Sequence, residues 1–189
     1  MPESNDLRET LLNLGRGFEV SQCIFVAAEL KLADLLAEHP QHCNTLAEAT
    51  ATDCDALYRL LRVLEEVNVV TEIAPQQFAL APLGQYLRSD VSGSIRNYLL
   101  MRAEQGYLTW GQLLYSLRQG KNSFEQVFGM SRFQYLKQNP SAGARFDSAM
   151  TELLKQQTVM IAAAYDFSMA NTLVDVGGGE GHLLITLLL

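Results

Sequence analysis

A glycine-rich turn close to Leu189 carries the residues whose types and spacing could do chemistry. Asp175, Gly177, Gly179 and Gly181 form the pattern Asp-x-Gly-x-Gly-x-Gly. Glycines lack a Cβ, so their backbone can approach a ligand closely and adopt positive φ angles. A carboxylate at this place could face a positively charged group of the ligand. The pattern therefore predicts a turn that binds a nucleotide-like cofactor.

Two other glycine-rich cofactor turns do not fit. The dinucleotide fingerprint needs glycines at its first, third and sixth positions. Counting from Gly177 puts His182 at the sixth position, and counting from Gly179 puts Leu184 there. A phosphate-binding P-loop needs Lys followed directly by Ser or Thr after its glycines, and no such pair follows here. An ordinary glycine-rich turn is the alternative, which the flanking apolar segments disfavour.

Those flanking segments would hold the turn in position. Residues 173–176 predict a buried strand, and the chain from Leu183 onward predicts an apolar helix. Strand, turn and helix in this order begin a Rossmann-like α/β sheet. We therefore expect a helical domain over residues 1–165 and the incomplete start of a cofactor-binding domain over residues 166–189.

The first domain is predicted to be mainly helical. Apolar residues recur at helical spacing over residues 7–39, and we expect Gly15 and Gly17 to separate two helices there. Residues 45–48 have the form of a capping box, and residues 52–55 carry a second helix-start signal. Together these patterns predict four helices before the chain changes its period.

A β-hairpin is predicted next. Residues 69–73 and 78–80 read as strands around a turn, so helix, turn, helix and hairpin follow in the order of a winged helix. Further helices are expected beyond Pro82, one with Gly120 as its C-terminal cap. A long helix should begin at Pro140 and end near Ala164.

The charge of this winged-helix segment argues against nucleic acid as a partner. Residues 45–85 hold two arginines and six carboxylates, a net charge of −4, and the whole chain carries −7. A DNA-binding helix needs positive charge for phosphates. A structural or dimerisation role is favoured over DNA binding.

Other features favour a cytoplasmic protein that binds no metal. No apolar run approaches the roughly 20 residues that span a bilayer, and no basic, then apolar secretory signal opens the sequence. Three cysteines without a recurring spacing, Cys23, Cys43 and Cys54, indicate reduced thiols. A metal cluster of His39, His42 and Cys43 is disfavoured, since no second cluster completes its ligands.

The glycine pattern is also the first motif of class I S-adenosylmethionine-dependent methyltransferases. Nearly the whole chain resembles O-methyltransferases of the caffeate, hydroxyindole and antibiotic-tailoring type. The similar blocks, in the family's order, are residues 30–36, 57–64, 78–84, 110–113, 120–124 and 146–150. One departure is Ala81, where the family usually has Thr.

The resemblance implies a cofactor, an acceptor and a partner. The N-terminal helical domain of such proteins forms a homodimer and closes over the acceptor pocket, and S-adenosyl-L-methionine donates a methyl group to a small hydroxylated, mostly aromatic molecule. The implied cofactor-binding residues are Asp175, Gly177, Gly178, Gly179 and Gly181, and the implied substrate-binding residues are Phe146 and Met150. The spacing of Phe146 and Met150 equally fits plain helix core.

The same resemblance implies that the ribose-binding acid and the general-base histidine lie beyond Leu189, so we assign no catalytic residue. His182, His39 and His42 do not substitute for that histidine. We expect the 189-residue chain alone to be inactive. A non-catalytic dimerisation module is the alternative, and a winged-helix regulator is a third. Phenolic acids, polyketide hydroxyls and indoles are all compatible acceptors.

Overall fold

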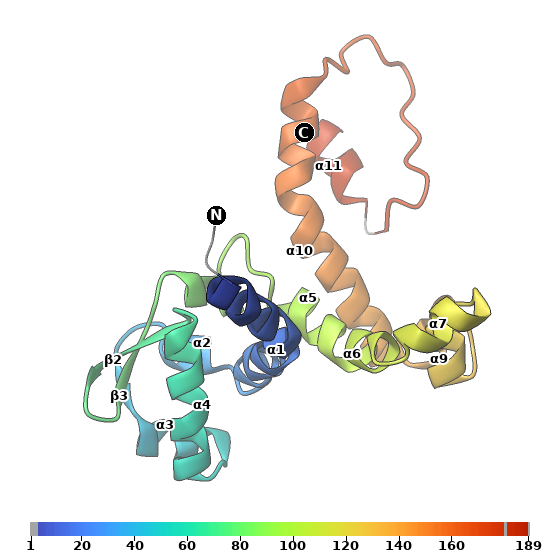
Figure 1. Ribbon diagram of the computed structural model, residues 1–189. Helices are drawn as coiled ribbons and strands as arrows, with labels where there is room; N and C mark the ends of the chain where they lie inside the picture. Colours follow the sequence, from blue (N-terminus) through green and yellow to red (C-terminus); the bar gives the residue numbers. More distant parts are fainter. Residues whose placement is uncertain (1–3, 180, 189) are drawn as a thin grey trace. The chain divides into compact units, whose positions relative to one another are not determined.

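The computed structural model describes residues 4–179 and 181–188 and divides into two compact units, up to Asp90 and from Val91 onward (Figure 1). The first unit contains α1 (Ser4–Glu29), α2 (Leu32–Leu35), β1 (Gln41–His42), α3 (Cys43–Thr50), α4 (Cys54–Glu66), β2 (Val70–Ala74), β3 (Gln77–Leu80) and the 3₁₀ turn η1 (Leu83–Leu87). None of the helices described is long and apolar enough to cross a bilayer. The predicted functional boundary after residue 165 stays a prediction.

The helix α1 is continuous, and the predicted break at Gly15 and Gly17 is wrong. A glycine inside a helix costs only about 1 kcal/mol relative to alanine, which neighbouring turns can offset. Four large apolar side chains of α1 are exposed by 53% to 73%: Leu7, Leu11, Leu14 and Phe18. The helix thus presents an uncovered apolar stripe within the described chain.

The two helices after α2 begin with different caps. The Nδ1 atom of His42 accepts a hydrogen bond from the Asn44 N–H at 3.2 Å, so α3 already starts at Cys43. The predicted capping box at residues 45–48 is therefore wrong, because Thr45 lies inside the helix. The start of α4 is as predicted: Asp53 Oδ1 accepts from the Ala56 N–H at 2.8 Å.

The predicted hairpin is confirmed as β2 and β3, and β1 adds a third antiparallel strand in the order β1-β3-β2. The apolar face of α4 and the hairpin share a core in which Leu61, Leu64 and Phe78 are fully buried. Helix, helix and hairpin thus follow one another as expected, and α4 packs on β2.

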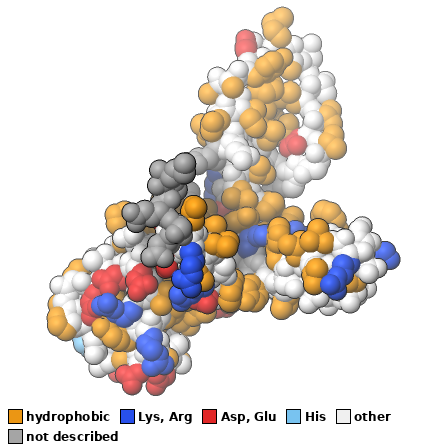
Figure 2. Space-filling model, viewed as in Figure 1, with side chains coloured by type: hydrophobic (Ala, Val, Ile, Leu, Met, Phe, Trp, Pro, Cys, Tyr) orange, Lys and Arg blue, Asp and Glu red, His pale blue; other side chains and the backbone are white. Residues whose placement is uncertain are grey.

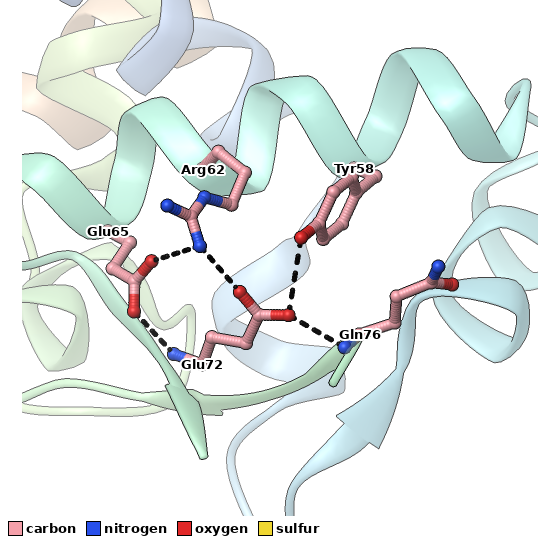
Figure 3. A network of polar contacts seen from close by, with 5 residues as sticks. All are labelled: Tyr58, Arg62, Glu65, Glu72 and Gln76. Atoms are coloured by element: carbon pink, nitrogen blue, oxygen red, sulfur yellow. Dashed lines mark hydrogen bonds and ion pairs between the residues drawn. The ribbon is translucent and has the colours of Figure 1, made fainter. Parts of the chain in front are cut away.

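A polar network also fastens the hairpin to α4 (Figure 3). The Glu72 carboxylate accepts from Arg62 at 2.8 Å, from the Gln76 N–H at 2.7 Å and from the Tyr58 hydroxyl at 3.4 Å. Its own N–H donates to the Glu65 carboxylate at 3.0 Å. The Gln76 N–H and then Arg62 lower the pKa of Glu72, because both favour its charged form.

All regular elements described in the second unit are helices. It contains α5 (Arg96–Met101), the π-helical turn η2 (Arg102–Gly106), α6 (Tyr107–Trp110), α7 (Leu113–Gln119), α8 (Ser123–Phe128), α9 (Arg132–Gln138), α10 (Pro140–Ala164) and α11 (His182–Leu188). Gly120 ends α7 with a φ of +63°, and α10 has its predicted bounds. The chain is mainly α, with a small sheet, as expected.

The predicted buried strand at residues 173–176 is wrong. This segment belongs to no sheet in the described residues, and Val174 and Val176 are 79% and 92% exposed. A parallel strand is stabilised by its neighbours and by helices on both faces, and all three described strands belong to the first unit. The predicted helix after the turn is confirmed as α11. Glu180 and Leu189 lie outside the described residues.

Candidate functional site

A cavity of about 410 Å³ lies in the second unit between α10 and the glycine-rich turn that leads into α11. Six of the seven predicted site residues line it: Phe146, Met150, Asp175, Gly177, Gly178 and Gly179. The helix α10 packs against α11, which brings segments separated by some 25 residues to one place. The structure thus brings six of the seven predicted residues to one cavity.

The wall formed by α10 is mainly apolar. Phe146, Met150, Leu154 and Ile161 contribute to it from positions near one face of the helix. Phe146 and Met150 are only half-buried, whereas Ala149 between them is fully buried in the core. Phe146 and Met150 therefore line the cavity with part of their surface, and their role in substrate binding stays a prediction.

The opposite wall carries an unpartnered carboxylate oxygen. Asp175 Oδ2 is buried, and no hydrogen-bond partner for it exists among the described residues. A Cβ on Gly178 would collide with this carboxylate, so only glycine leaves room for Asp175 to fold over the turn. A buried acceptor without a donor is costly, and a positively charged donor would satisfy it.

The glycines shape the turn in the way their spacing predicts. Gly177, Gly179 and Gly181 have φ angles of +78°, +57° and +75°, a region that L side chains rarely adopt. Gly181 is the one predicted residue outside the cavity lining, and it closes the turn by donating its N–H to the Gly178 carbonyl at 2.8 Å. A carboxylate oxygen without a hydrogen-bond partner, a turn made of glycines and an apolar wall fit a cofactor that has an ammonium group.

The structure adds residues that sequence reasoning missed. Thr158 is buried and lines the cavity. The exposed residues Gln157 and Phe133 line it as well. The helical period starting at Phe146 could have indicated Leu154 and Thr158, whereas Phe133 lies on α9 and needed the fold. His182, which we had set aside as a catalytic base, also lines this cavity.

A guanidinium lies beside the aromatic part of this wall. The Cζ atom of Arg132 is 5.4 Å from the centre of the Phe146 ring and 6.0 Å from that of Phe124. Its Nε is buried without a hydrogen-bond partner among the described residues. Burial, and then the charge of Arg102, lower the pKa of Arg132. The α9–α10 corner is therefore a positive spot on an acidic chain.

The second unit also exposes apolar surface around the cavity. Figure 2 shows hydrophobic side chains gathered over α10 and the segment that leads to α11. The exposed residues of this region include Val159, Met160, Ile161, Tyr165, Val174 and Val176. The Ile185 and Leu188 side chains of α11 are also exposed, by 51% and 72%.

The disfavoured metal cluster has other contacts in the structure. His39 Nε2 lies 2.9 Å from Gln41 Nε2, His42 caps α3, and Cys43 lies against Cys54. Within residues 4–179 and 181–188, no group of three or more His, Cys, Asp or Glu side chains is arranged to hold a metal ion.

Two family models match most of the chain. Residues 12–90 match the O-methyltransferase dimerisation domain, and residues 110–188 match the O-methyltransferase domain. The first match covers almost all of the first unit, and the second contains the whole cavity lining.

Individual relatives agree with these matches. The chain is 37% identical to the phenazine O-methyltransferase PhzM of Lysobacter antibioticus over 182 residues, 96% of this chain and 53% of the relative. The crystal structure of LaPhzM superposes with a TM-score of 0.93 at 37% identity, over 96% of this chain and 55% of that one. This chain thus spans about half the length of the curated relatives it matches.

A third relative was solved with ligands. The O-methyltransferase NcsB1 from neocarzinostatin biosynthesis, in complex with S-adenosylmethionine and 2-hydroxy-5-methyl naphthoic acid, is 34% identical, with a TM-score of 0.76 over 89% of this chain and 52% of that one. The cofactor that the family uses is the one that the glycine pattern predicts. The chain belongs to the class I S-adenosylmethionine-dependent O-methyltransferases of the antibiotic-tailoring type.

Proposed function

We propose that this chain provides the dimerisation region, the acceptor-side wall and the first cofactor turn of an enzyme that methylates a small hydroxylated aromatic molecule. The observation that carries the proposal is a cavity lined by the positive-φ glycine turn, by Asp175 with its unpartnered oxygen and by apolar residues of α10. The names of two relatives, a phenazine O-methyltransferase and a 3-amino-4-hydroxybenzoate 4-O-methyltransferase, support an aromatic acceptor.

The residues of the turn hold the cofactor in this proposal. The Asp175 carboxylate binds the ammonium group, and Gly177, Gly178 and Gly179 let the backbone approach the methionine and ribose parts. S-adenosyl-L-methionine, when bound, supplies an electrophilic methyl group on a sulfonium ion. Phe146 and Met150 lie against that cation and the acceptor, because aromatic faces and thioethers contact cations and rings favourably.

Arg132 acts on the acceptor side. Its guanidinium lies against Phe146, so it places positive charge next to the proposed aromatic site. Positive charge stabilises an ionised phenol, which is the more nucleophilic form of the oxygen that attacks the methyl group. Arg132 would therefore favour acidic phenols and aromatic acids over neutral alcohols.

A homodimer is the proposed assembly. The stripe of exposed apolar residues on α1 is of the kind that a second copy covers, and most of α1 falls within the matched dimerisation domain. We also propose that α3, α4 and the hairpin form a winged helix that serves this assembly. Its net charge of −4 leaves it without the positive surface that DNA requires.

The 189 residues alone are proposed to bind cofactor without transferring a methyl group. Of the three histidines only His182 lines the cavity, and it directly follows the last glycine of the turn that holds the cofactor. A general base must reach the acceptor proton at hydrogen-bond distance. We propose that His182 contacts the cofactor side and does not reach the acceptor proton.

Equilibrium dialysis with labelled S-adenosyl-L-methionine tests the proposed site. The chain should bind the cofactor, and Asp175→Asn should weaken binding by about ten- to a hundredfold, because a charged hydrogen bond is lost. Asp147→Asn is the matched control, since Asp147 lines the same cavity from α10 but is exposed. Equal losses in both variants would contradict the role of Asp175.

A turnover assay on the same samples tests the rest of the proposal. Labelled methyl should not appear on a phenolic acceptor such as a hydroxybenzoate with the 189-residue chain. Transfer above the rate without protein would overturn the proposal that these residues hold no general base.

A further inference from the structure

The thiols of Cys43 and Cys54 meet between the first residues of α3 and α4. Their Sγ atoms are 3.6 Å apart, and the Cys43 thiol also donates to the Cys54 carbonyl at 3.4 Å. Cys43 is fully buried and Cys54 is half-buried. The Cys54 thiol has a second acceptor, Asn44 Oδ1, at 2.9 Å. Two helix starts thus place a dithiol in direct contact.

We propose that Cys43 and Cys54 are a modification site, a dithiol that a small disulfide such as glutathione disulfide oxidises to an intramolecular disulfide. A disulfide has an S–S distance of about 2.05 Å, so the sulfur atoms must approach by about 1.5 Å. Rotation of the Cys54 side chain away from Asn44 supplies part of that movement. The fold therefore needs a local adjustment and no unfolding.

Glutathione disulfide is the oxidant in this reaction and accepts the two electrons that the protein thiols lose. Cys54, the more accessible thiol, loses its proton to water and attacks one sulfur of glutathione disulfide, so that the S–S bond breaks and one glutathione leaves. The Cys43 sulfur then attacks Cys54 Sγ, and its proton goes to the second departing glutathione. Two protein thiols are oxidised, and one glutathione disulfide is reduced to two glutathione molecules.

Burial decides the order of these steps. Burial and the contact with Cys54 raise the pKa of Cys43 to about 12, so Cys43 stays protonated and is a poor first nucleophile. Once Cys54 carries glutathione, Cys43 is the thiol next to it, and the reaction becomes intramolecular. Cys54 thus serves as the entry thiol and Cys43 as the resolving thiol.

The third cysteine provides an internal control. Cys23 lies on α1, outside the pair formed at the starts of α3 and α4, and is half-buried. Burial, and then the charge of Glu19, raise its pKa. If contact geometry decides oxidation, Cys23 should stay a free thiol while the pair closes.

Mass spectrometry of the folded chain, incubated with glutathione disulfide and digested without reduction, tests the proposal. The expected product has lost two hydrogen atoms, contains a peptide linked between Cys43 and Cys54, and has Cys23 free. Cys23→Ser should retain the link. Cys54→Ser should abolish it, with an unchanged circular dichroism spectrum showing that the variant folds.

The unfolded chain supplies the second comparison. In urea the effective concentration of one thiol for the other should fall by about tenfold or more, because the contact is lost. A folded wild-type chain that stops at a glutathione adduct on Cys54 would overturn the proposal. So would a link that forms equally well in urea, or one that joins Cys23 to either member of the pair.

Discussion

Glu72 in the first unit and Asp175 in the second are carboxylates beside tight turns, but their surroundings are opposite. Glu72 accepts hydrogen bonds from Arg62, Tyr58 and the Gln76 N–H, and its pKa is lowered. Asp175 Oδ2 is buried without any partner in the described chain. A carboxylate whose hydrogen-bond acceptors are all used, such as Glu72, stabilises a hairpin. A carboxylate with an unused acceptor in a cavity lining, such as Asp175, can bind a donor from a ligand.

The substitution Gly178→Ala should have the largest effect on cofactor binding. The added Cβ would collide with the Asp175 carboxylate and turn it away from the cavity. The displaced carboxylate would lose its charged hydrogen bond to the cofactor, so the affinity for S-adenosyl-L-methionine should fall by about ten- to a hundredfold. Isothermal titration calorimetry measures this loss. Unchanged affinity would show that Gly178 does not hold Asp175 in its binding position.

Exchanging the charge of each carboxylate should separate the two roles. Asp175→Asn should weaken cofactor binding by about tenfold or more and leave the melting temperature unchanged or raised, because a buried unpaired oxygen is neutralised. Glu72→Gln should lower the melting temperature by a few degrees and leave cofactor affinity unchanged. Thermal melts with and without cofactor check both. A reversed pattern would contradict the assignment of structure to one carboxylate and binding to the other.

The hydrogen bonds of Glu72 should also make the stability of the protein depend on pH. The lowered pKa of Glu72 means that its contribution is fully present above its ordinary value, 4.5, and is lost as the pH falls through the lower folded-state value. Urea unfolding between pH 6 and about pH 3 should therefore show a steeper loss of stability in the wild type than in Glu72→Gln. Parallel curves would mean that the network of Figure 3 contributes little in solution.

The smallest expected effect comes from a glycine without a role in any turn. A Cβ at Gly15 in α1 would meet nothing within 4 Å. Gly15→Ala should therefore stabilise the protein by about 0.5–1 kcal/mol, because alanine favours helix, and should not alter cofactor binding. Chemical denaturation checks the first outcome. A destabilised variant would mean that α1 bends at Gly15 in solution, as its sequence suggests.

Local patterns predicted most helices and the hairpin, and they picked out six residues that line one cavity. The helix period through Phe146 and Met150 and the glycine spacing after Asp175 are local signals, and the structure brings them to one cavity. The start of α4 at Asp53 follows equally from a local cap. The helix predictions succeeded because each depends on neighbours a few residues away, whereas the binding roles of the cavity residues stay predictions.

Predictions that depend on distant partners failed or could not be made. Residues 173–176 have the composition of a buried strand but no described strand beside them, and composition alone does not supply a hydrogen-bonded neighbour. The start of α3 was missed for a different, local reason: its cap is the His42 ring, which is not one of the usual capping side chains. The contact of Cys43 with Cys54 joins two helix starts and follows only from the packing of α3 on α4.

The central claim is that Asp175 and the glycine turn hold the cofactor against α10. Nuclear magnetic resonance of the ¹⁵N-labelled chain, titrated with S-adenosyl-L-homocysteine, tests it most directly. Two sets of amide signals should shift: those of Gly177, Gly178 and Gly179, and those around Phe146 and Met150. The hairpin signals around Glu72 should not shift. Saturable shifts confined to the first unit, or none at the glycine turn, would contradict it.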